Sequence, residues 1–249
     1  MEQRLDEWSK DLTNDYFERQ FKNPYRSTVK FCDWLEELKV LTPQTKANIM
    51  DVGTGKGSNL HYMKERFPNC KYLGLDINSD FIEEGNTIIK KLNISDCNLE
   101  LGDIYKLNIE KHGNKFDGII SYQTFSWLPG YEKPLDEIIK LNAKWVSFTS
   151  LFYDGLVDCK IEVQEYHNPE DEKSFKTSFY NIYSLPRIQN FLLKRGFKIF
   201  KYTPFEIDID LPKPEHSNMQ TYTEKLMDGK RLQISGPINM SWFFVYASR

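Results

Sequence analysis

The stretch NIMDVGTGKG, residues 48–57, is the most informative part of this 249-residue chain. Its first five residues form a short apolar run that is typical of a buried strand, and three glycines alternate with other residues directly after it. Glycine lets a backbone pass close to a ligand, and the helix expected next, to about Phe67, offers the unpaired N–H groups of its first turn. The G-x-G-x-G spacing departs from the G-x-G-x-x-G fingerprint of dinucleotide-binding proteins. The stretch therefore predicts a strand, a ligand-binding turn and a helix.

Strands and helices alternate on the C-terminal side of this turn. We expect strands at residues 71–75, 98–101, 116–121, 144–150, 197–202 and 242–248. Helices are expected at about residues 80–92, with Asp80 and Glu83 as a capping box, at residues 135–141, and from Ser184-Leu185-Pro186 to Arg195. This alternation predicts a parallel sheet that is covered by helices on both faces.

The N-terminal residues 1–47 and two later segments lie outside the alternation. Apolar residues recur at helical spacing over residues 3–20 and 28–40, with a break at Asn23-Pro24 between them. Residues 151–183 and 204–236 are polar, aromatic and without clear periodicity, so we interpret them as insertions that cover the functional edge of the sheet. We expect one domain over residues 1–249, made of a helical cap (1–47), a cofactor-binding core (48–150) and these two substrate-side insertions.

Two aspartates follow neighbouring strands of the predicted sheet. Asp76 lies 23 residues after Gly53, at the end of the second strand, where a carboxylate can accept both ribose hydroxyls of a nucleoside. Asp103 ends the third strand, where it could accept the exocyclic amine of adenine. Ligands of open α/β sheets bind at the carboxyl ends of the strands, where the glycine turn also lies. The combination predicts a nucleoside cofactor.

These motifs resemble those of the class I S-adenosylmethionine-dependent methyltransferases, most strongly over residues 49–150. The resemblance implies a Rossmann-like, doubly wound α/β fold with a seven-stranded sheet whose last strand is antiparallel. It also implies S-adenosyl-L-methionine as cofactor and S-adenosyl-L-homocysteine as product. It assigns the methionine part to Gly53, Thr54, Gly55, Ser121 and Tyr122, the ribose to Asp76 with Ile77, and adenine to Asp103 with Ile104.

Other site residues are hypotheses from their positions. Arg26, about 27 residues before Gly53, could pair with the cofactor carboxylate. The acceptor pocket should face the same sheet edge, and the substrate-binding candidates are Tyr153, Asp154, Tyr180 and Tyr183. His167 is the candidate general base. The sequence has no H-E-x-x-H motif and no Cys/His cluster, so we expect no metal.

The acceptor class is indicated by two features. The fourth strand ends in Ser121-Tyr122-Gln123-Thr124 and lacks the Asn/Asp-Pro-Pro-Tyr typical of methyltransferases that act on nucleobase or amide nitrogens. Residues 205–212 and 229–237 resemble the tail of small-molecule methyltransferases from bacterial capsule and surface-polysaccharide gene clusters, which implies O-methyl transfer to a precursor such as a phosphoramidate. An anionic acceptor would need a cation, for which Arg187 and Arg231 are candidates. N-methylation of another metabolite, an NAD-type oxidoreductase and a non-catalytic cofactor-binding regulator remain alternatives.

Composition limits the partners. The formal charge of −3 argues against nucleic acid, because phosphate neutralisation needs clustered Lys and Arg. No apolar run approaches the about 20 residues of a membrane span. Residues 1–30 are charged throughout, so we expect no signal peptide, and the four scattered cysteines are typical of a cytoplasmic protein. We therefore expect a small-molecule substrate and leave the oligomeric state open.

Of 36 aromatic residues, 23 fall in residues 121–249, which predicts a partly aromatic substrate chamber. Glu206, Asp208 and Asp210 alternate along an expected solvated edge strand.

Overall fold

The computed structural model describes residues 20–166, 168, 170, 173–214 and 219–249. The helix predicted over residues 3–20 therefore lies outside the described residues, apart from Gln20, which is helical. The candidate base His167 also lies outside them.

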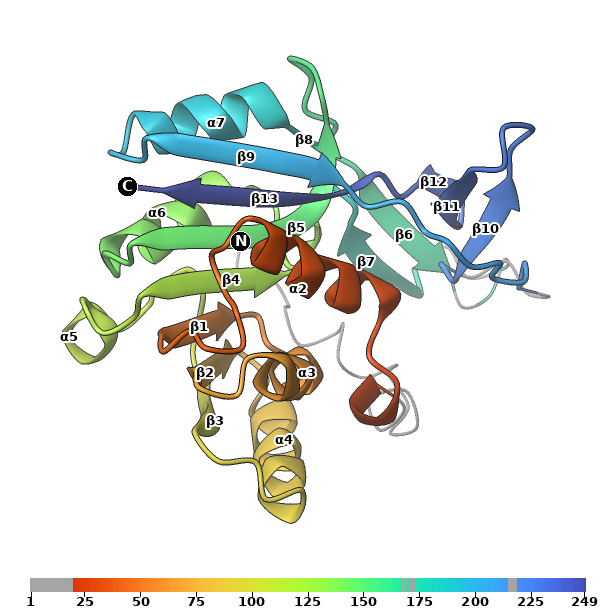
Figure 1. Ribbon diagram of the computed structural model, residues 1–249. Coiled ribbons are helices and arrows are strands. Elements are labelled where there is room, and N and C mark those ends of the chain that lie inside the picture. The colour runs from red at the N-terminus through yellow and green to blue at the C-terminus, as the bar shows by residue number, and fades with distance from the viewer. Residues whose placement is uncertain (1–19, 167, 169, 171–172, 215–218) are drawn as a thin grey trace.

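An eight-stranded sheet forms the centre of the molecule, and its main path runs β3-β2-β1-β4-β5-β13-β9 (Figure 1). The strands are β1 (Asn48–Val52), β2 (Lys71–Asp76), β3 (Cys97–Leu101), β4 (Gly118–Tyr122), β5 (Trp145–Tyr153), β9 (Ile199–Pro204) and β13 (Trp242–Ser248). Strands β1 to β5 pair in parallel, whereas β13 is antiparallel to both β5 and β9. This confirms the predicted Rossmann-like sheet with its last strand antiparallel. The short β8 (Tyr183–Ser184) pairs with β5 beside the main path and was not predicted.

Helices cover both faces of the sheet because successive strand residues point to opposite sides. Ile49 packs with α2 (Arg26–Glu37), α3 (Ser58–Arg66) and α4 (Ser79–Lys91). Its neighbour Met50 packs in the other cluster with α6 (Glu132–Lys140) and α7 (Leu185–Leu193). Two short turns of helix, α5 (Ile109–His112) and η2 (Phe125–Trp127), follow β3 and β4. Within the described part of the chain, the longest apolar helices fall short of what a bilayer span requires.

The start of α4 differs from the predicted capping box. The N-cap is Asn78, whose side-chain oxygen accepts the backbone N–H groups of Asp80 (2.9 Å) and Phe81 (3.2 Å). Asn78 has the extended backbone that a cap needs, and this places Asp80 inside the first turn. The predicted start of α7 is confirmed, because the Ser184 side chain accepts the N–H of Arg187 (3.3 Å) with proline in the first turn.

The two insertions fold into small β-sheets beyond the carboxyl ends of β4 and β5 (Figure 1). One contains the hairpin β6 (Glu162–Tyr166) with β7 (Phe175–Phe179), and the other contains β10 (Thr221–Lys225), β11 (Arg231–Ser235) and β12 (Ile238–Asn239). A separate apolar cluster packs against the end of the main sheet and includes Leu151, Tyr180, Ile238, Met240 and Trp242. The insertions therefore stand next to the edge where the site is expected.

The edge strand predicted at Glu206, Asp208 and Asp210 is wrong. These residues lie between β9 and β10, outside any described strand. Their carboxylates pair instead with the side chains of Lys230, Arg26 and Arg231, respectively. The three acidic side chains therefore connect residues 206–210 to the rest of the protein through ion pairs, and this segment pairs with no described strand.

Candidate functional site

The glycine turn joins β1 to α3 and has the backbone conformation that glycine allows. Gly53 and Gly55 have φ values of +81° and +57°. A Cβ atom on Gly53 would lie only 2.4 Å from Oγ1 of Thr124, which follows β4. The N–H groups of Gly53 and Thr54 both donate to the carbonyl of Leu75 at the end of β2 (2.8 and 3.0 Å). The turn is thus held against the carboxyl ends of both neighbouring strands.

Asp76 lies next to this turn at the end of β2. Its carboxylate accepts the backbone N–H of Gly55 (2.8 Å) and of Asn78 (3.0 Å). Burial raises the pKa of Asp76, and the backbone donors partly oppose that effect. An ionised carboxylate has about four acceptor positions, so two remain for ligand hydroxyls. Asp76 therefore combines a structural role with the capacity predicted for it.

A hollow of about 360 Å³ opens at the ends of β2 and β3. Its lining includes Ile77, Gly102 and Asp103, and continues to Lys106 and His112. One carboxylate oxygen of Asp103 accepts a hydrogen bond from the backbone N–H of Tyr105 (2.8 Å). Two residues assigned from sequence to the ribose and adenine, Ile77 and Asp103, thus border one hollow, while Ile104 is buried beside them in the core.

Asp51 is a further candidate site residue, which was not singled out from the sequence. It is fully buried on β1, and neither carboxylate oxygen has a hydrogen-bond partner in the described part of the chain. The hydroxyl of Thr54 in the glycine turn is also buried and unpaired there. Burial, together with the charge of Asp76, raises the pKa of Asp51 to about 7, although the nearby Thr54 hydroxyl and the backbone of Tyr122 lower it in part. The sequence does contain a signal for this residue, because Asp51 is an acidic residue within an otherwise apolar strand.

The end of β4 brings Ser121 and Tyr122 to the same edge. Ser121 Oγ donates to the carbonyl of Val52 (2.7 Å), which ties β4 to β1 just before the glycine turn. Tyr122 is buried under α2, where its ring meets Phe31 edge-on at 5.8 Å between centroids. All the residues predicted to bind the cofactor, other than Arg26, therefore lie on or directly after β1, β2, β3 and β4.

Arg26 is engaged by a residue far away in the sequence. It is the first residue of α2, and its Nε donates to Oδ1 of Asp208 at 2.8 Å, with a second contact from its terminal nitrogen. The two side chains are about half exposed, 51% and 45%. The Arg26 guanidinium, which was predicted to pair with the cofactor carboxylate, is thus paired with the Asp208 carboxylate in this structure.

The four substrate-binding candidates are placed differently. Tyr153 and Asp154 are exposed at the end of β5, where Asp154 accepts the hydroxyl of Tyr202 (3.0 Å). Tyr180 is buried, and its ring meets Trp127 edge-on at 4.4 Å between centroids. The structure does not bring these side chains together with Tyr183.

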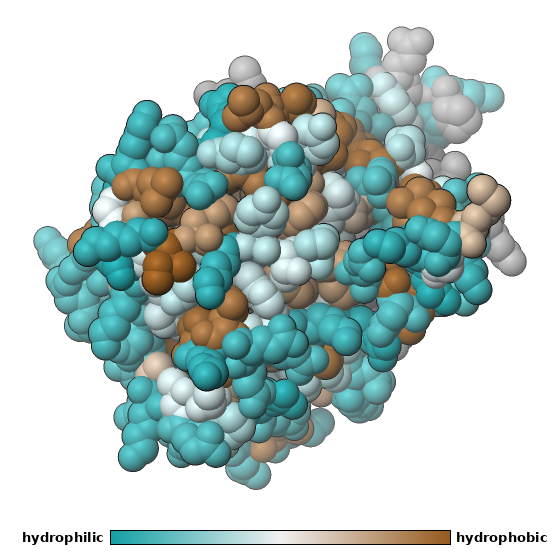
Figure 2. Space-filling model, turned by 45° about the horizontal axis from the view of Figure 1, so that its top comes forward, coloured by the Kyte–Doolittle hydropathy of each residue, from teal (hydrophilic) through white to brown (hydrophobic). Residues whose placement is uncertain are grey.

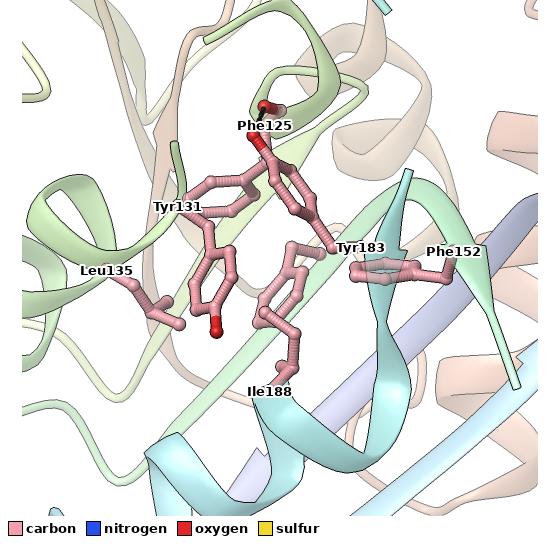
Figure 3. A pocket seen from close by; sticks show the side chains of 7 residues that line it. Phe125, Tyr131, Leu135, Phe152, Tyr183 and Ile188 are labelled. Atoms are coloured by element: carbon pink, nitrogen blue, oxygen red, sulfur yellow. Dashed lines mark hydrogen bonds between the residues drawn. The ribbon is translucent and has the colours of Figure 1, made fainter. Parts of the chain in front are cut away.

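Tyr183 belongs to the packed core. Its hydroxyl donates toward the carbonyls of Leu128 (3.1 Å) and Phe125 (3.2 Å) and accepts from Asn181 (3.2 Å). Figure 3 shows its ring among aromatic and aliphatic side chains from β5, α6 and α7 that point toward one another. The space between them is too small for a water molecule. Much of the aromatic excess after residue 121 is therefore packing and does not form the walls of a chamber.

The candidate cations for an anionic acceptor are paired with carboxylates. Arg187 lies 3.2 Å from Asp158, and Arg231 Nε lies 2.6 Å from Asp210. On the outer surface, the face in Figure 2 carries apolar side chains in separate patches within a mainly hydrophilic surface. The candidate site is thus the edge formed by the glycine turn, Asp51, Asp76 and the hollow.

Comparison with known proteins identifies the family of the domain. Residues 43–182, more than half of the chain, match a family model described as a methyltransferase domain. The uncharacterized protein RP028 of Rickettsia prowazekii is 32% identical over 111 residues, which cover 43% of this chain and 44% of that protein. The chain therefore matches less than half the length of this curated relative.

Solved structures share the fold at low sequence identity. The YcgJ protein of Bacillus subtilis has a TM-score of 0.58 at 9% identity, with 89% of this chain and 98% of that chain covered. The N-terminal domain of EvdMO1, solved with S-adenosylhomocysteine bound, has a TM-score of 0.54 at 11% identity, with 88% and 81% covered. At these identities the two structures establish a common fold.

Proposed function

The chain belongs to the methyltransferase domain family, and we propose that it is an S-adenosylmethionine-dependent enzyme that methylates a small molecule. The observation that carries the proposal is one sheet edge that combines a positive-φ glycine turn, the half-buried Asp76 carboxylate and a hollow bordered by Asp103. This edge follows the general rule that ligands of open α/β sheets bind outside the carboxyl ends of the strands. EvdMO1, a protein of the same fold, binds the product form of this cofactor.

The residues at this edge fit S-adenosylmethionine. The unpaired Asp51 carboxylate and Thr54 hydroxyl need a cationic or donating partner, which the ammonium of the methionine part offers. Asp76 has acceptor positions left for the two ribose hydroxyls, and Asp103 borders the hollow that suits adenine. Arg26 can exchange the Asp208 carboxylate for that of the cofactor.

In methyl transfer the protein mainly positions the two reactants and forms no covalent bond to either of them. When bound, S-adenosylmethionine supplies a methyl group on an electrophilic sulfonium. The chain positions the acceptor in line with that methyl group and keeps water away from it, which aligned, buried side chains achieve. The glycine turn and Ser121 fix the cofactor side of this geometry, since both are anchored to strand ends. His167 stays our proposal for the group that takes a proton from the acceptor.

The finer proposal is O-methyl transfer to a capsule or surface-polysaccharide precursor such as a phosphoramidate. Its support is the sequence resemblance of residues 205–212 and 229–237. A phosphoryl acceptor would have to displace Asp158 from Arg187 or Asp210 from Arg231, because each arginine holds a carboxylate. N-methylation of another small metabolite is the alternative within the same activity. We also propose a single domain over residues 1–249, with the two insertions on the substrate side.

Two assays test the activity. Calorimetry should detect S-adenosylhomocysteine binding to the full chain, and Asp76→Asn should weaken it at least tenfold, because hydrogen bonds to a charged acceptor are worth about 1.5–3 kcal/mol each. Lys144, which pairs with Asp117 at the opposite end of the sheet, provides a matched control as Lys144→Met with unchanged binding. Tritium should then pass from labelled S-adenosylmethionine into a bacterial small-molecule extract. An oxidoreductase would instead bind NADH and give no labelled product.

A further inference from the structure

Three buried side chains with hydrogen-bond donors lie at the end of β4, in the middle of β5 and at the start of β13, and these donors make no hydrogen bond within the described fold. They are the Tyr122 hydroxyl, the Thr149 hydroxyl and the Trp242 indole N–H, and none has a partner within hydrogen-bonding geometry in the described part of the chain. The side chains are 6%, 0% and 4% exposed. The Ser27 and Thr28 hydroxyls lie near that of Tyr122 and partly offset the rise that burial causes in its pKa. An unpaired buried donor loses its hydration without compensation, so a native protein rarely keeps one without a reason. We call these three residues the buried donor cluster.

The sheet register places the cluster on one face. Tyr122 pairs with Thr149 across β4 and β5, and Thr149 pairs with Phe244 across β5 and β13. Trp242 lies two residues from Phe244, so it points to the same face. Directly paired residues are about 5 Å apart and diagonal neighbours about 7–8 Å apart. The three donors are therefore within reach of one small molecule.

Other buried hydroxyls of β5 are satisfied. Ser147, on the same face as Thr149, donates to the carbonyl of Val245 (2.8 Å). Ser150 on the opposite face pairs with Ser126. Ser147 and Ser150 of β5 thus have hydrogen-bond partners within the fold. The exception, Thr149, lies beside Tyr122 at the end of β4.

We propose that the buried donor cluster holds hydrogen-bond-accepting oxygen atoms of the methyl acceptor. The inference rests on the proposed function, because Tyr122 directly follows Ser121, whose hydroxyl ties β4 to the residue before the glycine turn. The cluster therefore lies beside the expected position of the methionine part. Three convergent donors favour a hydroxyl, carboxylate or phosphoryl group. The Trp242 indole N–H can only donate, so it would find no partner in an aliphatic ammonium, whereas the two hydroxyls can also accept.

Access to the cluster requires one segment to move. The ring of Phe31 lies 5.8 Å from that of Tyr122, and the ring of Phe205 lies 5.8 Å from that of Phe244. Phe205 begins the segment 205–210, whose three carboxylates are tied by side-chain ion pairs. Exposed ion pairs hold a segment only weakly. The backbone N–H of Phe205 donates to the carbonyl of Trp242 (2.8 Å), so residues 206–210, which follow this anchor, are the part of the cover that opens to admit the acceptor.

The test compares variants of the full chain in the label-transfer assay with serial dilutions of the bacterial small-molecule extract. Thr149→Val should raise the extract concentration for half-maximal rate about fivefold to tenfold, the effect of one lost hydrogen bond, and Trp242→Phe should act in the same direction. Thr149→Ser should restore the lower value. S-adenosylhomocysteine affinity should stay within twofold of wild type. Because the Thr149 hydroxyl is unpaired, Thr149→Val should keep or raise Tm.

Ser147→Ala provides the matched control. It removes a satisfied hydroxyl from the same face of β5, so it should lower Tm without changing the half-saturating extract concentration. Wild-type half-saturation in both Thr149→Val and Trp242→Phe would overturn the inference while leaving the proposed function intact. A wild-type protein that neither binds S-adenosylhomocysteine nor transfers label would overturn the proposed function, and the inference with it.

Discussion

Replacement of Asp51 by asparagine tests the electrostatics of the cofactor edge. The folded protein raises the pKa of this carboxyl from 3.8 to about 7, chiefly through burial. Between these two values the folded state binds more protons at Asp51 than the unfolded chain does, so the free energy of unfolding falls as pH rises. The difference of about 3 pKa units corresponds to at most about 4 kcal/mol, reached above pH 7.

Asparagine keeps the shape of the side chain and removes this titration. Relative to wild type, Asp51→Asn should therefore be more stable at pH 8 than at pH 4, by up to about 4 kcal/mol. For a chain of this size that corresponds to a Tm difference of roughly 10 °C. Thermal unfolding of both proteins at the two pH values measures it. A stability change of equal size at pH 4 and pH 8 would refute the reasoning.

Asp117→Asn serves as a control of opposite sign. Lys144, which bonds to the Asp117 carboxylate, and the backbone N–H of Asn48 hold the pKa of that carboxyl below its ordinary value. Its contribution to stability is present above the unfolded pKa and is lost as pH falls through the folded pKa. The variant should therefore lose stability at pH 8 and little at pH 3. The same direction of change in both variants would contradict the assignment.

Three further substitutions test other parts of the account. Gly53→Ala should lower stability by more than about 1 kcal/mol in denaturant titrations, because its Cβ meets Thr124 and its φ is positive. Asp208→Asn should free Arg26, change Tm little and tighten S-adenosylhomocysteine binding a fewfold in calorimetry; weaker binding would contradict the exchange of carboxylates. Tyr183→Phe should lower stability by about 1–2 kcal/mol and leave label transfer per folded molecule unchanged, whereas a specific loss of transfer would assign that residue to the site.

The main elements, and the meeting of the candidate site residues at one sheet edge, could be predicted from sequence because their signals are local. Residues 242–248 are recognisable as a strand from their apolar run, and the structure has a strand with the same bounds. The glycine turn, Asp76 and Asp103 each follow a predicted strand, and a parallel sheet necessarily brings such positions to one edge.

The rest depends on contacts between distant segments. Arg26 and Asp208 are 182 positions apart in the chain, and no local pattern indicates their pairing. Tyr183 fits equally well in a core or in a pocket, and only the carbonyls that its hydroxyl meets place it in the core. The missing partners of Thr149 and Trp242 follow from the register of three strands, which the residue types alone do not define.

The transfer of a labelled methyl group tests the central claim most directly. The full chain is incubated with S-adenosylmethionine tritiated on the methyl group and a bacterial small-molecule extract, and the products are separated and identified. The account predicts label in a small, oxygen-rich product, less of it with Asp76→Asn, and S-adenosylhomocysteine as the other product. No transfer of label, together with no S-adenosylhomocysteine binding, would contradict it.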